Sequence, residues 1–256
     1  MKYLMLHSVD HDATAEAEAR ATPEALDAWI AEMTARGVVL DGSRLQPVSD
    51  ATTVRAPEGR TVVTDGPFAE TKEQVAGYDV IDCPDLDSAV AVAAAHPTTH
   101  IGSIEVRAFA PGMPDPVVPE TPADGKYRYL MLVCADMRRA MAAAAADPEG
   151  FAADRQRETT SGASVEETND DVDVWIDDLG PKRLYGWALE FPDQAVTVRR
   201  VDDRVVTTDG PFAETKEQIA GYDLLECNDL DEAIAAAAAH PVAGGGVIEL
   251  RPLRAS

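Results

Sequence analysis

The sequence Asp-Gly-Pro-Phe-Ala-Glu-Thr-Lys-Glu-Gln occurs at residues 65–74 and again, letter for letter, at residues 209–218. When residues 61–109 are aligned without a gap on residues 205–253, 31 of the 49 positions are identical. Shared composition or shared secondary structure does not produce identity of this extent. We therefore interpret the chain as two tandem copies of one domain, and we call the ten-residue repeat the decapeptide.

The 256 residues are long enough for two domains that each have their own core. The repeat predicts a first domain at 1–109 and a second domain at 127–256. Residues 110–126 contain five prolines, and such a composition favours an extended linker. The second copy is longer than the first because of an expected insertion near 135–165.

Each copy alternates strand and helix patterns in the same order. Setting one predicted hairpin aside, that order is strand, helix, strand, strand, helix, strand, which is the ferredoxin-like arrangement of an α+β fold. Helices on one face of the sheet leave the other face open. We expect the two copies to bury their open faces together as an internal pseudo-dimer with a barrel-like core. In the first copy the predicted strands are 2–8, 38–40, 75–83 and 104–107, the helices are 22–37 and 85–96, and the hairpin is 53–64.

The composition excludes several classes of partner. The chain has 46 acidic and 22 basic residues and a net charge of -24, which repels nucleic acid and anionic membranes. Cys83, Cys134 and Cys227 form no Cys-x-x-Cys pair, so neither a metal site nor a disulfide framework is predicted, and no cofactor is expected. No apolar run has the length of a signal sequence or a membrane span, and we expect a cytoplasmic protein.

The decapeptide allows two interpretations. Its Asp-Gly-Pro start is typical of a turn, so the whole segment can be a structural clasp between the hairpin and the next strand. Its ionisable side chains can also hold a polar ligand or transfer protons. The candidates are Asp65 and Asp209 as catalytic groups, and Glu70, Lys72, Glu214 and Lys216 as ligand-binding groups.

The decapeptide, the Ala-Gly-Tyr-Asp that follows it, and a closing Glu-x-Arg strand resemble the YCII-related family, in the branch named after the Asp-Gly-Pro-Phe motif. The resemblance covers both copies. It implies a ferredoxin-like, dimeric α/β-barrel fold. It also implies an active site with a histidine and an aspartate in some members, dehydrochlorinase activity in one branch member, and a setting beside extracytoplasmic-function sigma factors.

The family's histidine lies on the first helix, and this chain has none there in either copy. Asp41 matches the family's aspartate but Tyr185 takes its place in the second copy. His7, at the end of the first strand, is the best substitute, although the second copy has Val133 at that position. His96, which ends a helix before a proline, is expected to act as a cation that offsets the helix dipole.

Three functions remain open from the sequence. The first is binding of a small polar ligand by the loops around Asp65 and Asp209. The second is an acid–base enzyme of the lyase or hydrolase type on a small polar metabolite, in which His7 acts with Asp65 and Lys72. The third is a module that binds a sigma factor through its acidic surface.

Overall fold

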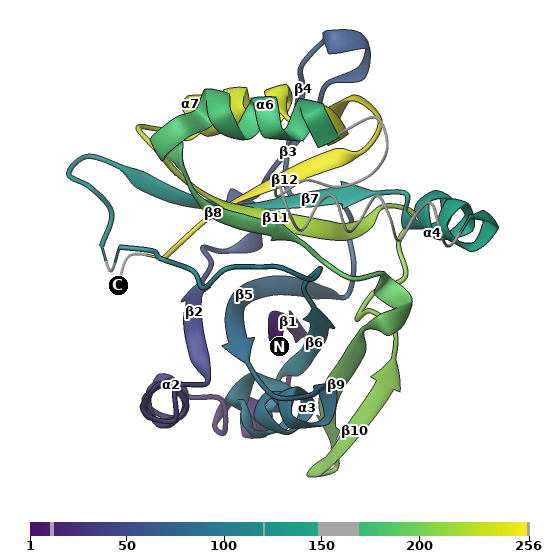
Figure 1. The fold of residues 1–256 in the computed structure, drawn as a ribbon. Coiled ribbons are helices and arrows are strands. Elements are labelled where there is room, and N and C mark those ends of the chain that lie inside the picture. The colour runs from purple at the N-terminus through teal and green to yellow at the C-terminus, as the bar shows by residue number, and fades with distance from the viewer. Residues whose placement is uncertain (11–12, 120, 148–168, 255–256) are drawn as a thin grey trace. The chain divides into compact units, whose positions relative to one another are not determined.

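The computed structural model describes residues 1–10, 13–119, 121–147 and 169–254 (Figure 1). The chain forms two compact units, and each unit contains segments of both sequence copies. The first unit consists of Met1–Leu45, Glu70–Phe109 and Pro192–Glu214, and the second consists of Gln46–Ala69, Ala110–Phe191 and Thr215–Ser256.

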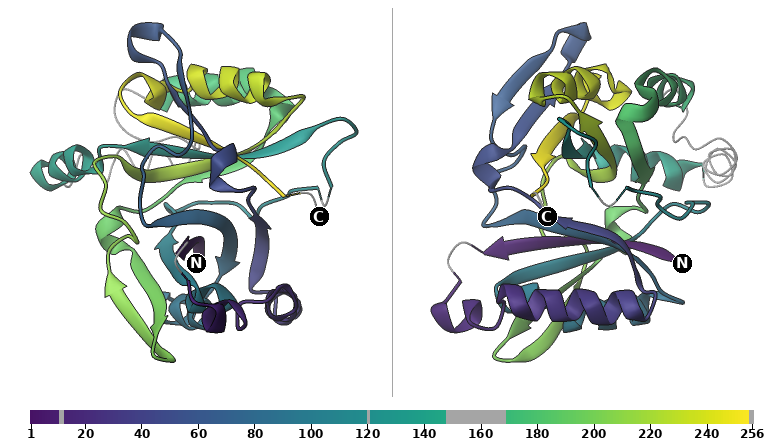
Figure 2. Two further views of the ribbon diagram at one scale, coloured as in Figure 1. Left: turned by 180° about the vertical axis from the view of Figure 1, so that it is seen from behind. Right: turned by 90° about the vertical axis from the view of Figure 1, so that its left-hand side faces the viewer.

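The first unit is a six-stranded antiparallel sheet with the strand order β10-β9-β6-β1-β5-β2. Helices α2 and α3 lie along one face of this sheet (Figure 2). The elements are β1 (Lys2–Asp10), α1 (Ala15–Glu18), α2 (Pro23–Ala35), β2 (Val39–Arg44), β5 (Glu73–Asp82), α3 (Leu86–Ala95), the 3-10 turn η3 (Pro97–His100), β6 (Gly102–Ala108), η5 (Pro192–Gln194), β9 (Val196–Val201) and β10 (Arg204–Asp209).

The helices begin where the sequence places their caps. The side chain of Thr22 accepts the N–H of Ala25 at the start of α2, and Pro23 occupies the first helical position, where its missing N–H costs nothing. Trp29 and Met33 then fall on one side of α2, where they pack with strand residues in the core. The predicted first helix is therefore confirmed.

The second unit repeats this plan with the strand order β4-β3-β12-β7-β11-β8. Its core cluster contains residues of α6 and α7 packed on the sheet. The elements are η1 (Val48–Asp50), β3 (Thr52–Arg55), η2 (Pro57–Gly59), β4 (Val62–Asp65), β7 (Tyr127–Ala135), α4 (Met137–Ala146), α6 (Asn169–Leu179), η4 (Gly180–Lys182), β8 (Arg183–Ala188), β11 (Gln218–Cys227), α7 (Leu230–Ala239), η6 (Pro241–Gly244) and β12 (Val247–Pro252). Helix α4 lies within the predicted insertion, and residues 148–165 of that insertion lie outside the described residues.

The two copies exchange their hairpins. The hairpin of β3 and β4 belongs to the first copy, yet β3 pairs with β12 of the second copy, with Val54 opposite Ile248. In the same way β9 pairs with β6 of the first copy, with Val198 opposite Ile104. Each sheet thus takes four strands from one copy in the ferredoxin-like order and two strands from the other. Both sheets are open, and the barrel-like core stays a prediction.

The first half of the decapeptide fastens the exchanged hairpin. Gly66 has a φ of 93°, and its carbonyl accepts the hydroxyl of Thr53. The N–H of Phe68 donates to Oε2 of Glu249 on β12 at 2.9 Å. In the first unit the N–H of Phe212 donates to Glu105 in the same manner, at 3.2 Å. These contacts give the Asp-Gly-Pro-Phe segment a structural role.

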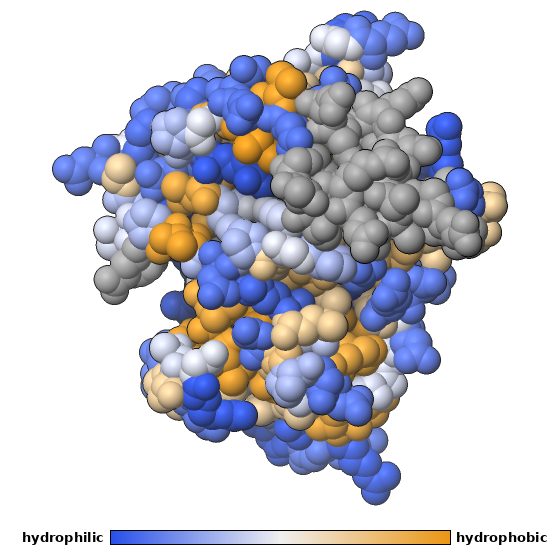
Figure 3. All heavy atoms as spheres, viewed as in Figure 1, coloured by the Kyte–Doolittle hydropathy of each residue, from blue (hydrophilic) through white to orange (hydrophobic). Residues whose placement is uncertain are grey.

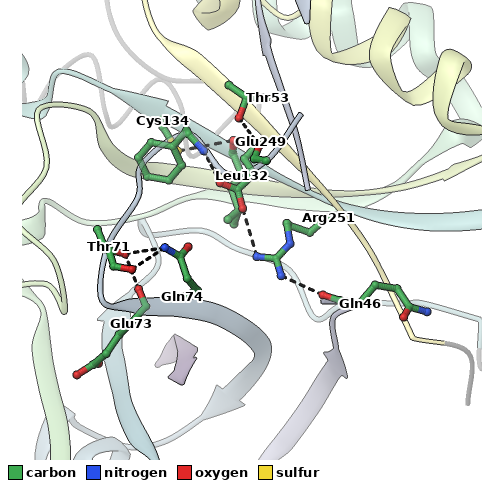
Figure 4. Close-up of polar contacts among 11 residues, drawn as sticks. Gln46, Thr53, Thr71, Glu73, Gln74, Leu132, Cys134, Glu249 and Arg251 are labelled. Carbon is green, nitrogen blue, oxygen red and sulfur yellow. Dashed lines mark hydrogen bonds and ion pairs between the residues drawn. The ribbon is translucent and has the colours of Figure 1, made fainter. Parts of the chain in front are cut away.

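The glutamates that receive these bonds belong to buried ion pairs. Glu249 contacts Arg251 on its own strand at 3.3 Å, and Arg251 also donates to the carbonyl of Gln46 (Figure 4). Glu105 and Arg107 form the matching pair at 2.6 Å. Desolvation raises the pKa of Glu249, because burial disfavours its charged form.

Hydrophilic residues cover much of the face drawn in Figure 3, as the high content of charged residues leads one to expect. Among the described residues, no helix is both long and apolar enough to cross a membrane.

Candidate functional site

The structure places the predicted site residues of the decapeptide on the surface. Lys72 forms an ion pair with Asp10 at 2.8 Å, and Lys216 contacts Glu217 at 3.3 Å. Asp65 lies in the second unit and His7 in the first, so the predicted pair of His7 and Asp65 does not form within one unit. The candidates with exposed side chains are Asp65, Glu70, Lys72, Asp209, Glu214 and Lys216.

His7 has a different carboxylate partner. Its Nε2 lies 3.0 Å from Oδ2 of Asp79 on the neighbouring strand β5. His7 is 8% exposed and Asp79 is 6% exposed. Since side chains alternate along a strand, His7 shares the face of Tyr3 and Met5, which is the face packed against the helices. The pair therefore lies between the sheet and its helical layer.

A second histidine completes the cluster. His96 follows α3, and its ring centroid lies 4.3 Å from that of His7 and 4.4 Å from that of Trp29. Its Nε2 is 3.9 Å from Oδ2 of Asp79. The expectation that His96 is a cation is wrong, because burial, with His7 nearby as a smaller cause, lowers its pKa to about 2. His96 is a neutral imidazole.

Glycine at position 42 makes room for the carboxylate. Gly42 on β2 is paired with Asp79, and a Cβ at this position would overlap Oδ1 of Asp79. Gly186 has the same relation to Asp223 in the second unit. A glycine is required on the edge strand in both copies because the aspartate side chain lies across its Cα.

The second copy keeps the aspartate but changes its partner. Nε of Arg183 contacts Oδ1 of Asp223 at 2.7 Å, and Val133 stands where the first copy has His7. In the first copy the position of Arg183 is taken by Val39. One copy therefore offers the buried carboxylate a titratable histidine, and the other offers an arginine that stays charged at all physiological pH values.

The first copy also leaves buried polar atoms without hydrogen bonds. Among the described residues, Nε2 of His96 and Nε1 of Trp29 have no hydrogen-bond partner, and Nε2 of His7 and Oδ2 of Asp79 have only their contact of 3.0 Å with each other. In the second copy Trp175 matches Trp29, and its Nε1 donates to a backbone carbonyl at 2.9 Å. Unpaired buried polar groups are uncommon in native proteins, so their concentration here marks a candidate site.

Two imidazoles and a carboxylate are a ligand set that binds divalent transition metals. The three ligand atoms of His7, Asp79 and His96 lie within 4.8 Å of one another. However, Nδ1 of His96 accepts the N–H of Thr98 at 3.1 Å, so the proton of the neutral ring is on Nε2. A ligating histidine has the opposite pattern, because it donates through its other ring nitrogen. The cluster is better suited to acid–base chemistry and hydrogen bonding.

The aspartate expected from the family pattern does not join this cluster. Asp41 accepts the hydroxyl of Tyr78 at 3.0 Å. Gly42 faces Asp79, so the adjacent Asp41 lies on the opposite face of the sheet. Neither Asp79 nor the role of His96 is predicted from the sequence. The available signal was the position of Asp79 in the middle of the mostly apolar strand 75–83, whereas Asp82 lies near the end of that strand.

Comparisons with known proteins agree with this architecture. A model of the YCII-related domain matches residues 1–111 and 191–255. An uncharacterised protein of Rhizobium meliloti (strain 1021) is 50% identical over 72 residues, which is 27% of this chain. The match covers 56% of that protein, so the chain spans little more than half of its length. On the extent of the domain match, the chain belongs to the YCII-related family.

Proposed function

We propose that the protein is an acid–base enzyme that acts on a small polar metabolite, and that only its first copy is active. His7 is the proton-transferring group and Asp79 orients it. The observation that carries the proposal is the contact of 3.0 Å between Nε2 of His7 and Oδ2 of Asp79. A histidine oriented by a buried carboxylate is the arrangement that general acid–base catalysis uses.

The second copy supports the assignment by contrast. Its buried Asp223 is neutralised by Arg183, which cannot give up a proton at physiological pH. Its position 133 is valine. The second copy therefore keeps the fold and its charge balance without a group that can cycle between protonation states. In this proposal it contributes strands and stability, and the first copy contributes chemistry.

Several predictions from the sequence remain proposals beside this one. Asp79 replaces Asp65 as the partner of His7, while Glu70, Lys72, Glu214 and Lys216 remain candidates for holding a polar ligand at the surface. The two decapeptides support a place in the Asp-Gly-Pro-Phe branch. The exchanged hairpins support an internal pseudo-dimer, and a sigma factor remains a proposed partner.

The test uses a variant that copies the second site into the first. His7→Val with Val39→Arg gives Asp79 the partner that Asp223 has, so the fold should be retained. Pools of small polar metabolites are incubated with each protein, and loss of substrate is followed by proton NMR. Turnover by the wild type should be lost in this double variant and kept in Asp65→Asn with Asp209→Asn. Turnover that is kept in His7→Val with Val39→Arg but lost in Asp65→Asn with Asp209→Asn would instead place the chemistry at the decapeptides.

A further inference from the structure

The tautomer of His96 is fixed by the turn that follows it. Nδ1 accepts the N–H of Thr98, and the ring is neutral, so Nε2 carries a hydrogen. His240 in the second unit accepts the N–H of Val242 at the same distance of 3.1 Å. The pattern occurs in both copies and so does not depend on His7. His96 therefore presents a fixed N–H donor to the cluster.

An acceptor lies close to this donor but does not bond to it. Oδ2 of Asp79 is 3.9 Å from Nε2 of His96, which is beyond hydrogen-bond range. Nε2 of His96 has no hydrogen-bond partner among the described residues, and Oδ2 of Asp79 has only the contact of 3.0 Å with Nε2 of His7, which leaves it a second lone pair. Leaving the buried N–H of His96 unpaired costs roughly 1–3 kcal/mol. A ligand that satisfies both atoms would recover that cost.

We infer that the cluster binds a hydroxyl group, which accepts the N–H of His96 and donates to Oδ2 of Asp79. A hydroxyl oxygen is the smallest group that accepts and donates at one atom. It belongs either to a substrate alcohol or to a water molecule. This inference deepens the proposed function, because the identification of the hydroxyl as part of a substrate rests on that proposal.

Other ligand classes fit the cluster less well. A carboxylate or phosphate has no hydrogen to donate to Asp79 and would add negative charge beside it. In the second copy Arg183 supplies a cation, but the first copy has Val39 at that position. A divalent metal ion cannot bind Nε2 of His96 while that atom carries hydrogen. An ammonium group cannot accept the N–H of His96.

The experiment observes the imidazoles directly and needs no substrate. The full chain is labelled with nitrogen-15 in its histidines, and long-range proton–nitrogen spectra are recorded while 1,2-ethanediol, acetate or zinc chloride is added separately. The diol should shift the Nε2 signal of His96 saturably and leave His240 unchanged. In His7→Val with Val39→Arg, the arginine occupies Asp79, and the diol affinity should fall by about tenfold or more.

The source of the hydroxyl follows from the same spectra. A nuclear Overhauser effect from a long-lived water to the Nε2 hydrogen of His96, abolished by the diol, assigns the site to an alcohol that replaces water. If it persists with the diol present, water itself is the resident hydroxyl.

Three results would overturn the inference: zinc removes the hydrogen from Nε2 of His96, acetate shifts the signal as the diol does, or neither the water contact nor the diol shift is found. Failure of the proposed function is distinguishable. Diol binding by a protein whose turnover does not depend on His7 would keep the inference and reject the enzyme. Turnover of substrates that lack a hydroxyl, together with an absence of diol binding, would keep the proposed enzyme and reject the inference.

Discussion

Replacement of Arg183 by valine should leave a buried carboxylate without a cation. The side chains of Arg183 and Asp223 are 18% and 8% exposed, and their charged atoms are 2.7 Å apart. Removing one partner of a buried ion pair costs about 3–5 kcal/mol. The loss has an upper limit because the carboxyl group can take up a proton, which at pH 7 costs roughly 4 kcal/mol for an aspartate of ordinary pKa. We expect a loss of about 3–4 kcal/mol at pH 7.

The loss should depend on pH with a defined sign. At pH 5 an aspartate of ordinary pKa is protonated at a cost of roughly 1.5 kcal/mol, so the deficit should shrink as the pH falls. Adding Val133→His to Arg183→Val places a histidine where the first copy has one. Because a histidine is a cation below about pH 6.5, the rescue should be larger at pH 6 than at pH 8.

Urea unfolding followed by tryptophan fluorescence measures both effects, since Trp175 and Trp187 lie in the same unit as the pair. A loss of unfolding free energy below about 0.5 kcal/mol at pH 7 is no larger than the effect of an ordinary surface substitution. Such a loss, or a rescue that does not change with pH, would contradict the inference that the buried carboxylate of Asp223 needs a cation beside it.

Three further measurements test the fold. Gly42→Ala should lower the free energy of unfolding by about 1–3 kcal/mol because its Cβ would overlap Asp79. Gly245→Ala is the matched control, since a Cβ at this position meets open space. Equal losses of stability in the two variants would contradict the close contact between Gly42 and Asp79. Burial raises the pKa of Glu249, so the stability that this carboxyl contributes is present below its unfolded pKa and is lost as the pH rises through its folded pKa. The wild type should therefore lose stability relative to Glu249→Gln as the pH rises above the ordinary pKa of a glutamate in urea titrations, and a constant difference would count against it. Burial also raises the pKa of Cys83, and it raises the pKa of Cys227 to about 11. Both buried thiols should therefore react with a disulfide reagent at pH 8 only after unfolding. Rapid labelling of these two cysteines in the native protein would disprove this.

Local elements could be predicted from the sequence because their signals are local. Thr22 and Pro23 mark the start of α2, and Asp85 caps α3 as its position before an apolar stretch indicates. The exchange of hairpins could not be predicted in the same way. The final strands of the two copies share the pattern Ile-Glu-x-Arg, so the sequence of a hairpin does not indicate which of the two strands it pairs with.

The candidate site was predicted in part. The sequence predicts His7 as a site residue but indicates Asp65 as its partner, because the decapeptide is rich in ionisable side chains. In the structure the partner of His7 is Asp79, a single aspartate within a strand. Alternation along the strands places His7 and Asp79 on defined faces, but the register that pairs His7 with Gly77 and Met5 with Asp79, and so brings the two side chains together, is a tertiary property. Comparison of the two copies held the missing information, since His7 and Val39 change together to Val133 and Arg183.

The hairpin exchange sets an order for synthesis of the chain. The first copy ends its own part of the sheet with β6 at Ala108, but the two strands that complete this sheet begin only at Val196. Because the ribosome synthesises the chain from its N-terminus, the first sheet stays incomplete, with the edge of β6 unpaired, while most of the second copy is made. Contacts of such long sequence separation slow folding, and unpaired edges invite association with other chains. A mutation that halts translation between these strands would therefore release an aggregation-prone fragment rather than a folded domain.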